Sequence, residues 1–450
     1  MWKGKNIKYV AGALLYVAFF SSCRSQRQIA GYGNPQVTIP FQTVVPVASP
    51  VVPVPEEKPV QQQQVVVEKY KSLSSVEFYG RGTWEGEIQY ALDSICNSGI
   101  MTTSQAGLYI YDLTSDRPIY ALNENQRLRP ASCQKLITSI SSLEYLGGDY
   151  QFVTDLFITG TVSQGTLSGD VYVVGTMDPL LSKGDVRKLA EMLKSSGISK
   201  ISGHLYLDVS MKDDLQYGWG WCWDDDYGPL SALTVDGKDE FSIHWIGALR
   251  NMGIGLSNKG VSFQICPSTA NSIGKIIHSM DQILVPMMKD SENIFAESMF
   301  YQLATRSGQK SAGRKQAVPL VEALISHMGL QPERYCIADG SGLSLYNYAS
   351  PILLATFLKH AYLNEPIRTH LYPSLPIAGI DGTLEKRMKE SAAFGKVHAK
   401  TGSLSGISTL SGYAESNNGH LLVFSIMNQG VEKMSVGRDF QDEICRIICK

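Results

Sequence analysis

A serine and a lysine stand three positions apart in the stretch RPASCQKL, at Ser132 and Lys135, where an apolar helical pattern begins. Residues at this spacing share one face of a helix, so the lysine amine would lie beside the serine hydroxyl. A serine hydroxyl becomes an effective nucleophile when a neighbouring base takes its proton. Lysine can be that base if burial and a second cation lower the pKa of its ammonium group. Because the same spacing is common on surface helices, other stretches of the sequence are needed to decide whether Ser132 and Lys135 form a catalytic pair.

Two later stretches supply groups that such a nucleophile needs. KDSENIFAE contains a Ser-x-Asn element, and HAKTGSLSG contains Lys-Thr-Gly followed by a serine on a strand of edge type; the residues are Ser291, Asn293, Lys400, Thr401, Gly402 and Ser403. The order Ser-x-x-Lys, Ser-x-Asn, Lys-Thr-Gly resembles that of penicillin-binding proteins and serine β-lactamases. Each motif alone has an ordinary structural explanation. Their common order in one chain makes coincidence a poor explanation.

The chemistry assigns a role to each side chain near the expected nucleophile. Ser132 is the predicted nucleophile, Lys135 its activator and Lys400 the second cation. The backbone N–H groups of Ser132 and Ser403 are expected to face the developing oxyanion.

The remaining motif residues are expected to handle the substrate. Ser291 would relay a proton to the leaving amine, and Asn293 would hold the substrate amide. Thr401 and Ser403 offer hydroxyls to a C-terminal carboxylate, beside the positive charge of Lys400.

Composition excludes several other classes. The 450 residues include 40 basic and 42 acidic ones, a formal charge of −2, which gives no electrostatic case for a nucleic-acid partner. The sequence has no Walker A motif and no dinucleotide fingerprint, and its eight histidines lack metal-ligand spacing. We therefore predict no cofactor and no metal site.

The first residues have the pattern of an export signal. Lysines 3, 5 and 8 precede the apolar run YVAGALLYVAFF, which is too short to span a bilayer, and small residues precede Cys23. Residues 1–23 are predicted to be a lipoprotein-type signal in which Cys23 carries a lipid anchor to a membrane. An ordinary signal peptide with a chance cysteine is the alternative. Residues 24–83, rich in Pro, Val and Gln, are predicted to be an extended tether.

The remaining chain predicts an α+β fold. We expect a helix over 85–99, a hairpin over 106–113 and 118–123, and a helix from Ser132 to 147. Helices follow over 281–305, 315–328 and 350–362, then strands over 395–403, 406–416 and 420–428 and a helix over 438–449. Short strands and one helix over 151–235 indicate an inserted β-rich domain. The catalytic domain would thus comprise 84–150 and 236–450.

With these motifs in place, the chain from about residue 84 to its C-terminus resembles the D-alanyl-D-alanine carboxypeptidase/endopeptidase family, the class C low-molecular-mass penicillin-binding proteins. WGWCWDDDYGPLSALTVDG, ADGSGLSLYNYASP and LPIAGIDGTLEKR resemble further stretches of that family. The resemblance implies a β-lactamase/transpeptidase-like fold, an antiparallel sheet flanked by helices. The interval between Ser132 and Ser291 is shorter than in better-known members, so the inner of their two nested insertions is missing.

The resemblance also implies a substrate and two more contacts. Peptidoglycan stem peptides would be the substrate, and β-lactams would acylate Ser132. Asp178 and Arg387 would contact the side chain of the stem peptide, although a turn aspartate and a solvated arginine explain these two residues equally well.

Several neighbouring residues have structural explanations. Trp219, Trp221 and Trp223 alternate as on one strand face, which favours packing over a sugar platform. Residues 224–226, all aspartates, are expected to form a solvated loop rather than a calcium site. His398 is expected to line the cleft without chemistry, and Cys133 to be packed away from it.

Three functions compete. The favoured one is a serine D-alanyl-D-alanine carboxypeptidase/endopeptidase that hydrolyses an acyl-enzyme on Ser132. A serine β-lactamase would share the acylation, but the inserted domain argues against it. A silent peptidoglycan-binding envelope protein would have at least one damaged motif, and none is damaged. The sequence predicts no oligomeric state.

Overall fold

A computed structural model describes residues 76–97, 99–222, 225, 228–309 and 311–450. The predicted signal, Cys23 and most of the predicted tether lie outside the described residues, as do Trp223, Asp224 and Asp226. At the start of the described part, Gln89 donates a hydrogen bond to the carbonyl of Glu77 at 2.7 Å. Within the described ranges, no helix has the length and apolar character needed to cross a membrane.

One five-stranded antiparallel sheet organises the catalytic part, in the order β12-β13-β14-β1-β2. Its strands are β1 (Gln105–Asp112), β2 (Arg117–Leu122), β12 (Val397–Leu404), β13 (Ile407–Glu415) and β14 (Leu421–Gln429). The predicted hairpin and the three predicted C-terminal strands are therefore confirmed. β12 lies at the edge of the sheet, as the Lys-Thr-Gly motif led us to expect.

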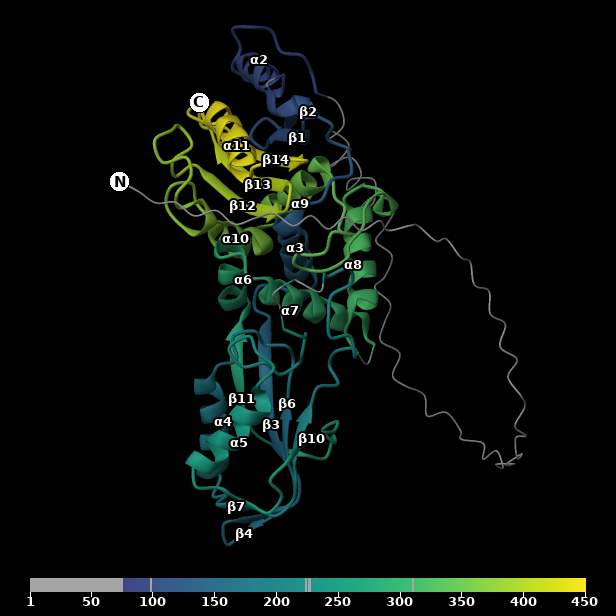
Figure 1. The fold of residues 1–450 in the computed structure, drawn as a ribbon, viewed down its shortest axis with the longest axis vertical. Helices are drawn as coiled ribbons and strands as arrows, with labels where there is room; N and C mark the ends of the chain where they lie inside the picture. The colour runs from purple at the N-terminus through teal and green to yellow at the C-terminus, as the bar shows by residue number, and fades with distance from the viewer. Residues whose placement is uncertain (1–75, 98, 223–224, 226–227, 310) are drawn as a thin grey trace, which may run out of the picture. The chain divides into compact units, whose positions relative to one another are not determined.

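Helices cover both faces of this sheet (Figure 1). Side chains alternate along a strand, so Leu108 and Ile110 point to one face and Tyr109 and Tyr111 to the other. The first pair packs with helices α2 (Trp84–Cys96) and α11 (Met434–Ile448). The second pair packs with α3 (Gln134–Leu146) and α9 (Pro351–Leu363). This arrangement confirms the predicted α+β class.

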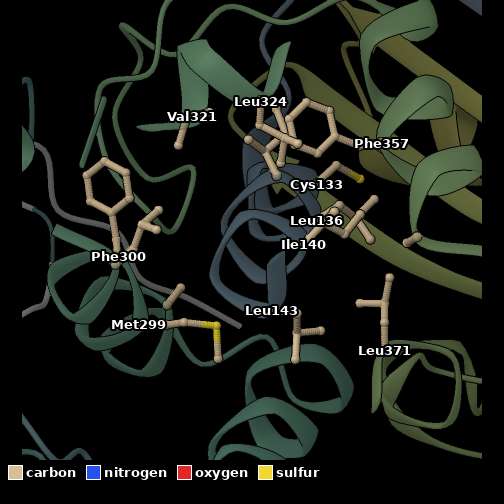
Figure 2. Packing of buried hydrophobic residues seen from close by; sticks show 14 of the residues in the cluster. Cys133, Leu136, Ile140, Leu143, Met299, Phe300, Val321, Leu324, Phe357 and Leu371 are labelled. Carbon is tan, nitrogen blue, oxygen red and sulfur yellow. The ribbon is translucent and has the colours of Figure 1, made fainter. Parts of the chain in front are cut away.

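The helix that follows Ser132 is the centre of the larger core. All residues of α3 are buried except Glu144 and Tyr145, because helices surround it. Figure 2 shows Leu136, Ile140 and Leu143 among side chains of its neighbours. The neighbours are α6 (Met280–Lys289), α7 (Asn293–Ala304), α8 (Arg314–His327) and α10 (Glu365–Ser374), together with α9. Such packing makes α3 a rigid support for the residues at its N-terminus.

In the described part of the chain, short 3-10 turns connect these elements. They are η2 (Gly99–Thr102), η3 (Ala131–Cys133), η4 (Thr305–Ser307), η5 (Pro332–Arg334) and η6 (Gly382–Leu384).

The segment between α3 and α6 forms two further sheets with their own apolar core. Their strand orders are β10-β8-β6-β3-β11 and β4-β5-β7-β9. The elements are β3 (Gln151–Ile158), β4 (Thr161–Ser163), β5 (Thr166–Ser168), β6 (Val171–Val174), α4 (Lys183–Ser195), β7 (Lys200–Ile201), β8 (Leu205–Asp208), α5 (Phe241–Asn251), β9 (Gly255–Leu256), β10 (Val261–Phe263) and β11 (Asn271–Ser279).

The boundary predicted at residue 235 cuts through this sheet. β11 pairs with β3 from Asn271 to Ser279, and Trp245 of α5 is completely buried in the core of the segment. Where the segment leaves and rejoins the catalytic part, Met280 N donates to the carbonyl of Tyr150 at 3.0 Å. We therefore propose that the insertion comprises residues 151–279. The sequence predicts this boundary too early, because the pairing of β11 with β3 and the packing of α5 in the core of the segment leave no local pattern in the sequence.

Candidate active site

Ser132 lies in the 3-10 turn η3, directly before α3. Ala131 has φ of 45°, a left-handed conformation that is strained for a residue with a Cβ. The carbonyl of Pro130 accepts hydrogen bonds from Cys133 N at 3.1 Å and from Thr409 Oγ1 at 2.8 Å. The sheet therefore holds the turn that presents Ser132.

The side chain of Lys135 lies next to Ser132, as the spacing predicts. Its Nζ is 3.0 Å from Ser132 Oγ, 2.5 Å from Asn293 Oδ1 and 2.9 Å from the carbonyl oxygen of Ser341. The last two oxygens can only accept hydrogen bonds. A neutral lysine amine has two N–H groups and one lone pair. Donation to these two acceptors leaves the lone pair for the Ser132 hydroxyl.

The surroundings of Lys135 favour its neutral form. The side chain is completely buried. Burial lowers its pKa well below the ordinary value, and the positive charge of Lys400 lowers the pKa further. The carboxyl groups of Asp339 and Glu297 act in the opposite direction. The balance makes Lys135 able to accept a proton from Ser132.

The second buried lysine of the site, Lys400, lies on β12. Lys400 Nζ donates to Ser291 Oγ at 2.9 Å and to the carbonyl of Thr401 at 2.9 Å. Burial lowers the pKa of Lys400 to about 8. Ser291, between α6 and α7, has φ of 66°, so the second strained residue of the site is also a motif residue.

A cleft of about 430 Å³ opens beside these groups. Six predicted site residues line it: Ser132, Ser291, Arg387, Thr401, Gly402 and Ser403. Sequence reasoning missed other lining residues, namely Thr383, Glu385, Lys386, Ser408, Thr409 and Arg438. The stretch LPIAGIDGTLEKR was a signal for the first three. No sequence signal pointed to Arg438, which lies on α11.

Half of the edge strand β12 is covered, and half borders the cleft. Ala399 N donates to the carbonyl of Pro376 at 2.9 Å, so Ala399 has its backbone groups on the outer side of the edge. Backbone direction alternates along a strand, which places the N–H of Ser403 on the same outer side. An added Cβ at Gly402 would lie 2.9 Å from Ser132 N. The two N–H groups expected at the oxyanion therefore lie on neighbouring backbone segments.

Two buried carboxyl groups support Lys135 from behind, and sequence reasoning missed both. Glu297 accepts hydrogen bonds from Gly340 N at 3.1 Å and Ser341 N at 2.8 Å, which fixes the loop whose carbonyl contacts Lys135. Burial and the charge of Asp339 raise the pKa of Glu297 to about 8. A usable signal existed, because Glu297 follows Asn293 by four positions on α7 and so shares its face.

The second carboxyl group, Asp339, orders the rest of the same loop. It accepts hydrogen bonds from Gly342 N at 2.8 Å, Ser344 N at 2.7 Å and Trp221 Nε1 at 2.9 Å. Trp221 belongs to the insertion, so this contact ties the insertion to the loop beside Lys135.

The structure does not bring Asp178 into the cleft. Its side chain has no exposed surface, accepts from Leu180 N at 3.0 Å and lies 2.6 Å from Nδ1 of His278. The hydrogen bond that His278 Nδ1 donates to the carboxylate of Asp178 raises the pKa of His278. Arg387 does line the cleft, but it donates to Asp442 of α11 at 2.6 Å.

Three other expectations have mixed outcomes. Cys133 is packed as expected, with Sγ 3.2 Å from the carbonyl oxygen of Lys400. His398 does not line this cleft; its ring stacks on Tyr372 at 4.5 Å. The expected strand at Trp219 and Trp221 is wrong, because Gly220 between them has φ of 81° and no strand forms there.

Within the part of the chain that the structure describes, no group of three or more His, Cys, Asp or Glu side chains could hold a metal ion. The cleft itself is lined by hydroxyl, carboxylate, ammonium and guanidinium side chains.

Comparison with known families identifies most of the chain. Residues 88–243 and 246–449 match the D-Ala-D-Ala carboxypeptidase 3 (S13) family. D-alanyl-D-alanine carboxypeptidase DacB of Haemophilus influenzae is 24% identical over 79% of this chain and 92% of its own length. D-alanyl-D-alanine carboxypeptidase of Actinomadura sp. is 27% identical over 76% of this chain and 81% of its own length.

Solved structures share the fold. Penicillin binding protein 4 (dacB) from Haemophilus influenzae has a TM-score of 0.72 at 23% identity, over 79% of this chain and 99% of that one. The predatory peptidoglycan endopeptidase Bd3459 from Bdellovibrio bacteriovorus has a TM-score of 0.52 at 18% identity, over 77% and 92%. The predicted β-lactamase/transpeptidase-like fold is thus confirmed in its penicillin-binding protein 4 form.

Proposed function

Because the chain belongs to the D-Ala-D-Ala carboxypeptidase 3 (S13) family, we propose that it hydrolyses the D-alanyl-D-alanine end of peptidoglycan stem peptides through an acyl-enzyme on Ser132. The observation that carries this proposal is the buried amine of Lys135, 3.0 Å from Ser132 Oγ at the wall of an open cleft. A lysine in that state is a base matched to a serine nucleophile.

Binding uses the edge of the sheet and its cation. The terminal carboxylate of the substrate meets the hydroxyls of Thr401 and Ser403 and the positive charge of Lys400. Asn293 has its carbonyl oxygen occupied by Lys135, so its amide N–H₂ is the group that can hold the substrate amide. The scissile carbonyl oxygen then faces the N–H groups of Ser132 and Ser403.

Acylation transfers one proton and replaces the carbon–nitrogen bond of the substrate by an ester bond to Ser132. Ser132 Oγ bonds to the carbonyl carbon while its proton passes to Lys135 Nζ. The carbon–nitrogen bond to the terminal D-alanine then breaks, and the leaving nitrogen takes the proton through the hydroxyl of Ser291. The products of this step are free D-alanine and an ester on Ser132.

Deacylation uses the same base. Water attacks the ester carbonyl and gives a proton to Lys135 Nζ, and Ser132 Oγ recovers that proton as it leaves. Hydrogen bonds to the Pro130 carbonyl hold the turn of Ser132, and Lys400 Nζ holds the hydroxyl of Ser291, through both steps.

A covalent label tests the proposal. The full chain is incubated with a labelled penicillin, and any adduct is mapped by mass spectrometry, with Ser132→Ala as the matched variant. We expect a long-lived adduct on Ser132 that is absent from the variant, and release of D-alanine from a D-Ala-D-Ala peptide. Rapid hydrolysis of the drug would instead indicate a β-lactamase. A folded wild-type chain with neither adduct nor turnover would refute the proposal.

We also propose that the chain is exported to the cell envelope and anchored by a lipid on Cys23. The support is the sequence pattern of residues 1–23 and the cell-wall substrate of the family. The test is fractionation of a bacterium that expresses the full chain or its Cys23→Ala variant. We expect membrane association of the wild type only; an equal distribution of the two would contradict the anchor.

A further inference from the structure

A run of arginines and aromatic rings lies on the outer side of the loop that supports Lys135. The members are Arg127, Arg129, Trp219, Arg314, Tyr346 and Tyr348, which we call the arginine–aromatic surface. The catalytic steps above use none of them.

Cation–π contacts, a ring contact and one hydrogen bond join these residues into one continuous row. The guanidinium carbons of Arg127 and Arg129 lie 5.3 and 5.5 Å from the ring centre of Tyr348. At the other end, the rings of Trp219 and Tyr346 are 5.0 Å apart, and the guanidinium carbon of Arg314 lies 4.4 Å from the ring centre of Trp219. Arg129 Nε donates to the carbonyl of Leu345 at 2.9 Å, which connects the two ends.

The charges in this row remain available. The hydrogen bonds of Arg129 and Arg314 go to neutral acceptors, the carbonyls of Leu345 and Ile337 and the hydroxyl of Tyr348. Among the described residues, none of the three arginines forms an ion pair with a carboxylate. A guanidinium has five N–H donors, so most of them can still meet an anion. The rings keep the guanidiniums in fixed positions.

The surface is open and apolar as well as basic. Trp219 and Tyr346 are 49% and 50% exposed. Exposed aromatic rings beside arginines are characteristic of surfaces that bind a partner. The ligand class that fits is an anionic one with flat or apolar parts.

The loop that carries part of this surface also supports the proposed active site. The loop bearing Tyr346 and Tyr348 also contains Ser341, whose carbonyl accepts from Lys135. An added Cβ at Gly342 would lie 1.8 Å from the carbonyl oxygen of Ala131, so the loop touches the turn of the nucleophile. A ligand on this surface would therefore bind to the loop that also holds Lys135 and contacts the turn of the nucleophile.

We propose that the arginine–aromatic surface binds a second, acidic stem peptide of the same peptidoglycan strand while the first stem occupies the cleft. This inference rests on the proposed function. Stem peptides carry free carboxylates, which complement the three arginines, and their alanine methyls and the attached sugars can contact the rings. The enzyme would then prefer stems on a polymer to a free peptide with the same D-Ala-D-Ala end.

The test compares two substrates that release the same product. One is soluble uncross-linked peptidoglycan strands with pentapeptide stems, and the other is a free N-acetylated pentapeptide. The full chain is compared with the double variant Arg127→Gln/Arg314→Gln and with Arg334→Gln, an exposed arginine of η5 outside the surface. D-alanine release gives kcat and KM for each.

We expect the double variant to raise KM for the strands by about tenfold, since two exposed charge contacts are lost, while kcat stays constant. Turnover of the free peptide and the kinetics of Arg334→Gln should not change. Salt should weaken the wild-type preference for strands and leave the double variant unaffected. Equal preference in wild type and double variant, or an equal loss on both substrates, would overturn the inference.

A binding experiment separates this inference from the proposed function. Co-sedimentation of the full chain with purified sacculi needs no turnover. If the wild type released no D-alanine from either substrate, the proposed function would fail. Weaker sedimentation of the double variant would still support the surface, and unchanged sedimentation would refute it.

Discussion

The two lysines of the site are equally buried and have different surroundings. Lys135 lies between α3, α7 and the loop at Ser341, with a hydroxyl and two oxygens that only accept. Lys400 lies on the edge strand, where it contacts the hydroxyl of Ser291 and the carbonyl of Thr401, two residues that line the cleft.

Their pKa values differ for the same reason. Burial lowers both, but Lys135 also experiences the positive charge of Lys400, so its pKa lies well below the ordinary value while that of Lys400 is about 8. Burial and the charge of Lys400 thus favour the neutral, proton-accepting form of Lys135, whereas Lys400, with a pKa of about 8, is mostly the cation at neutral pH. Two equally buried lysines can therefore have different roles. The lysine with the lower pKa acts as the base, and its neighbour keeps the positive charge.

Removal of the base should have the largest effect. Lys135→Ala is expected to lower kcat/KM for a D-Ala-D-Ala peptide by about 10,000-fold, because Ser132 loses the group that takes its proton. Penicillin acylation should fall in parallel when measured by adduct formation.

The folded state of Lys135→Ala must be checked by thermal unfolding. Removing a buried amine leaves Asn293 Oδ1 and the Ser341 carbonyl unpaired, so a lower melting temperature is expected. A folded variant with near wild-type acylation would show that Lys135 is not the base.

Removal of the cation should have the second-largest effect. Lys400→Ala is expected to lower kcat/KM by about 100-fold, because one electrostatic contact to the substrate is lost while the base remains. The loss should appear mainly for substrates with a free terminal carboxylate. If Lys400→Ala were as damaging as Lys135→Ala on a substrate without that carboxylate, the division of roles would be wrong.

The pH dependence should separate the two lysines further. kcat/KM should rise with pH as Lys135 loses its proton, and fall again as pH increases through about 8, where Lys400 loses its positive charge. One unit above that pKa the loss should approach about tenfold. Arginine stays protonated in this range, so Lys400→Arg should remove the alkaline decline whatever its absolute rate. An unchanged decline would assign it to another group.

The smallest effect should come from the support behind Lys135. Glu297 has a pKa of about 8, so it carries a proton at neutral pH and Glu297→Gln preserves its charge state and its acceptor oxygen. We expect activity within about threefold of wild type for Glu297→Gln, and a loss of about tenfold for Glu297→Ala, which leaves two buried N–H groups unpaired.

The matched pair of Glu297 variants distinguishes positioning from simple stability. Recovery of kcat in Glu297→Gln relative to Glu297→Ala, at temperatures where both are folded, would support positioning of the Ser341 carbonyl. A large loss in Glu297→Gln would show that Lys135 depends on a negative charge there.

The catalytic motifs were predictable because they are local. Ser132 and Lys135 lie on one helix start, and Lys400 to Ser403 on one strand, so spacing alone gave their relative positions. The prediction that these motifs meet at one cleft depended on the family resemblance in their order. The two groups of strands, β1-β2 and β12-β13-β14, were predictable because the strands within each group follow one another in the chain, whereas the pairing of β14 with β1 joins distant segments that no local pattern connects.

The features that the sequence did not predict depend on contacts between residues far apart in the chain. Asp178 was expected in the cleft, but His278, a hundred positions later, pairs with it. The end of the insertion depends on β11 pairing with β3, which no local pattern reveals. The alternation of Trp219 and Trp221 suggested a strand, and the glycine between them prevented it.

The half-covered edge of β12 limits the length of peptide that can pair with this strand. Residues 376–378 pair with Val397 and Ala399, so a foreign strand can align only with the short stretch from Thr401 onward. A peptide can add its last two or three residues there, but a long internal segment has no edge to continue along. The covered half of β12 therefore prevents further strand pairing, so the exposed part of the edge favours the end of a peptide chain.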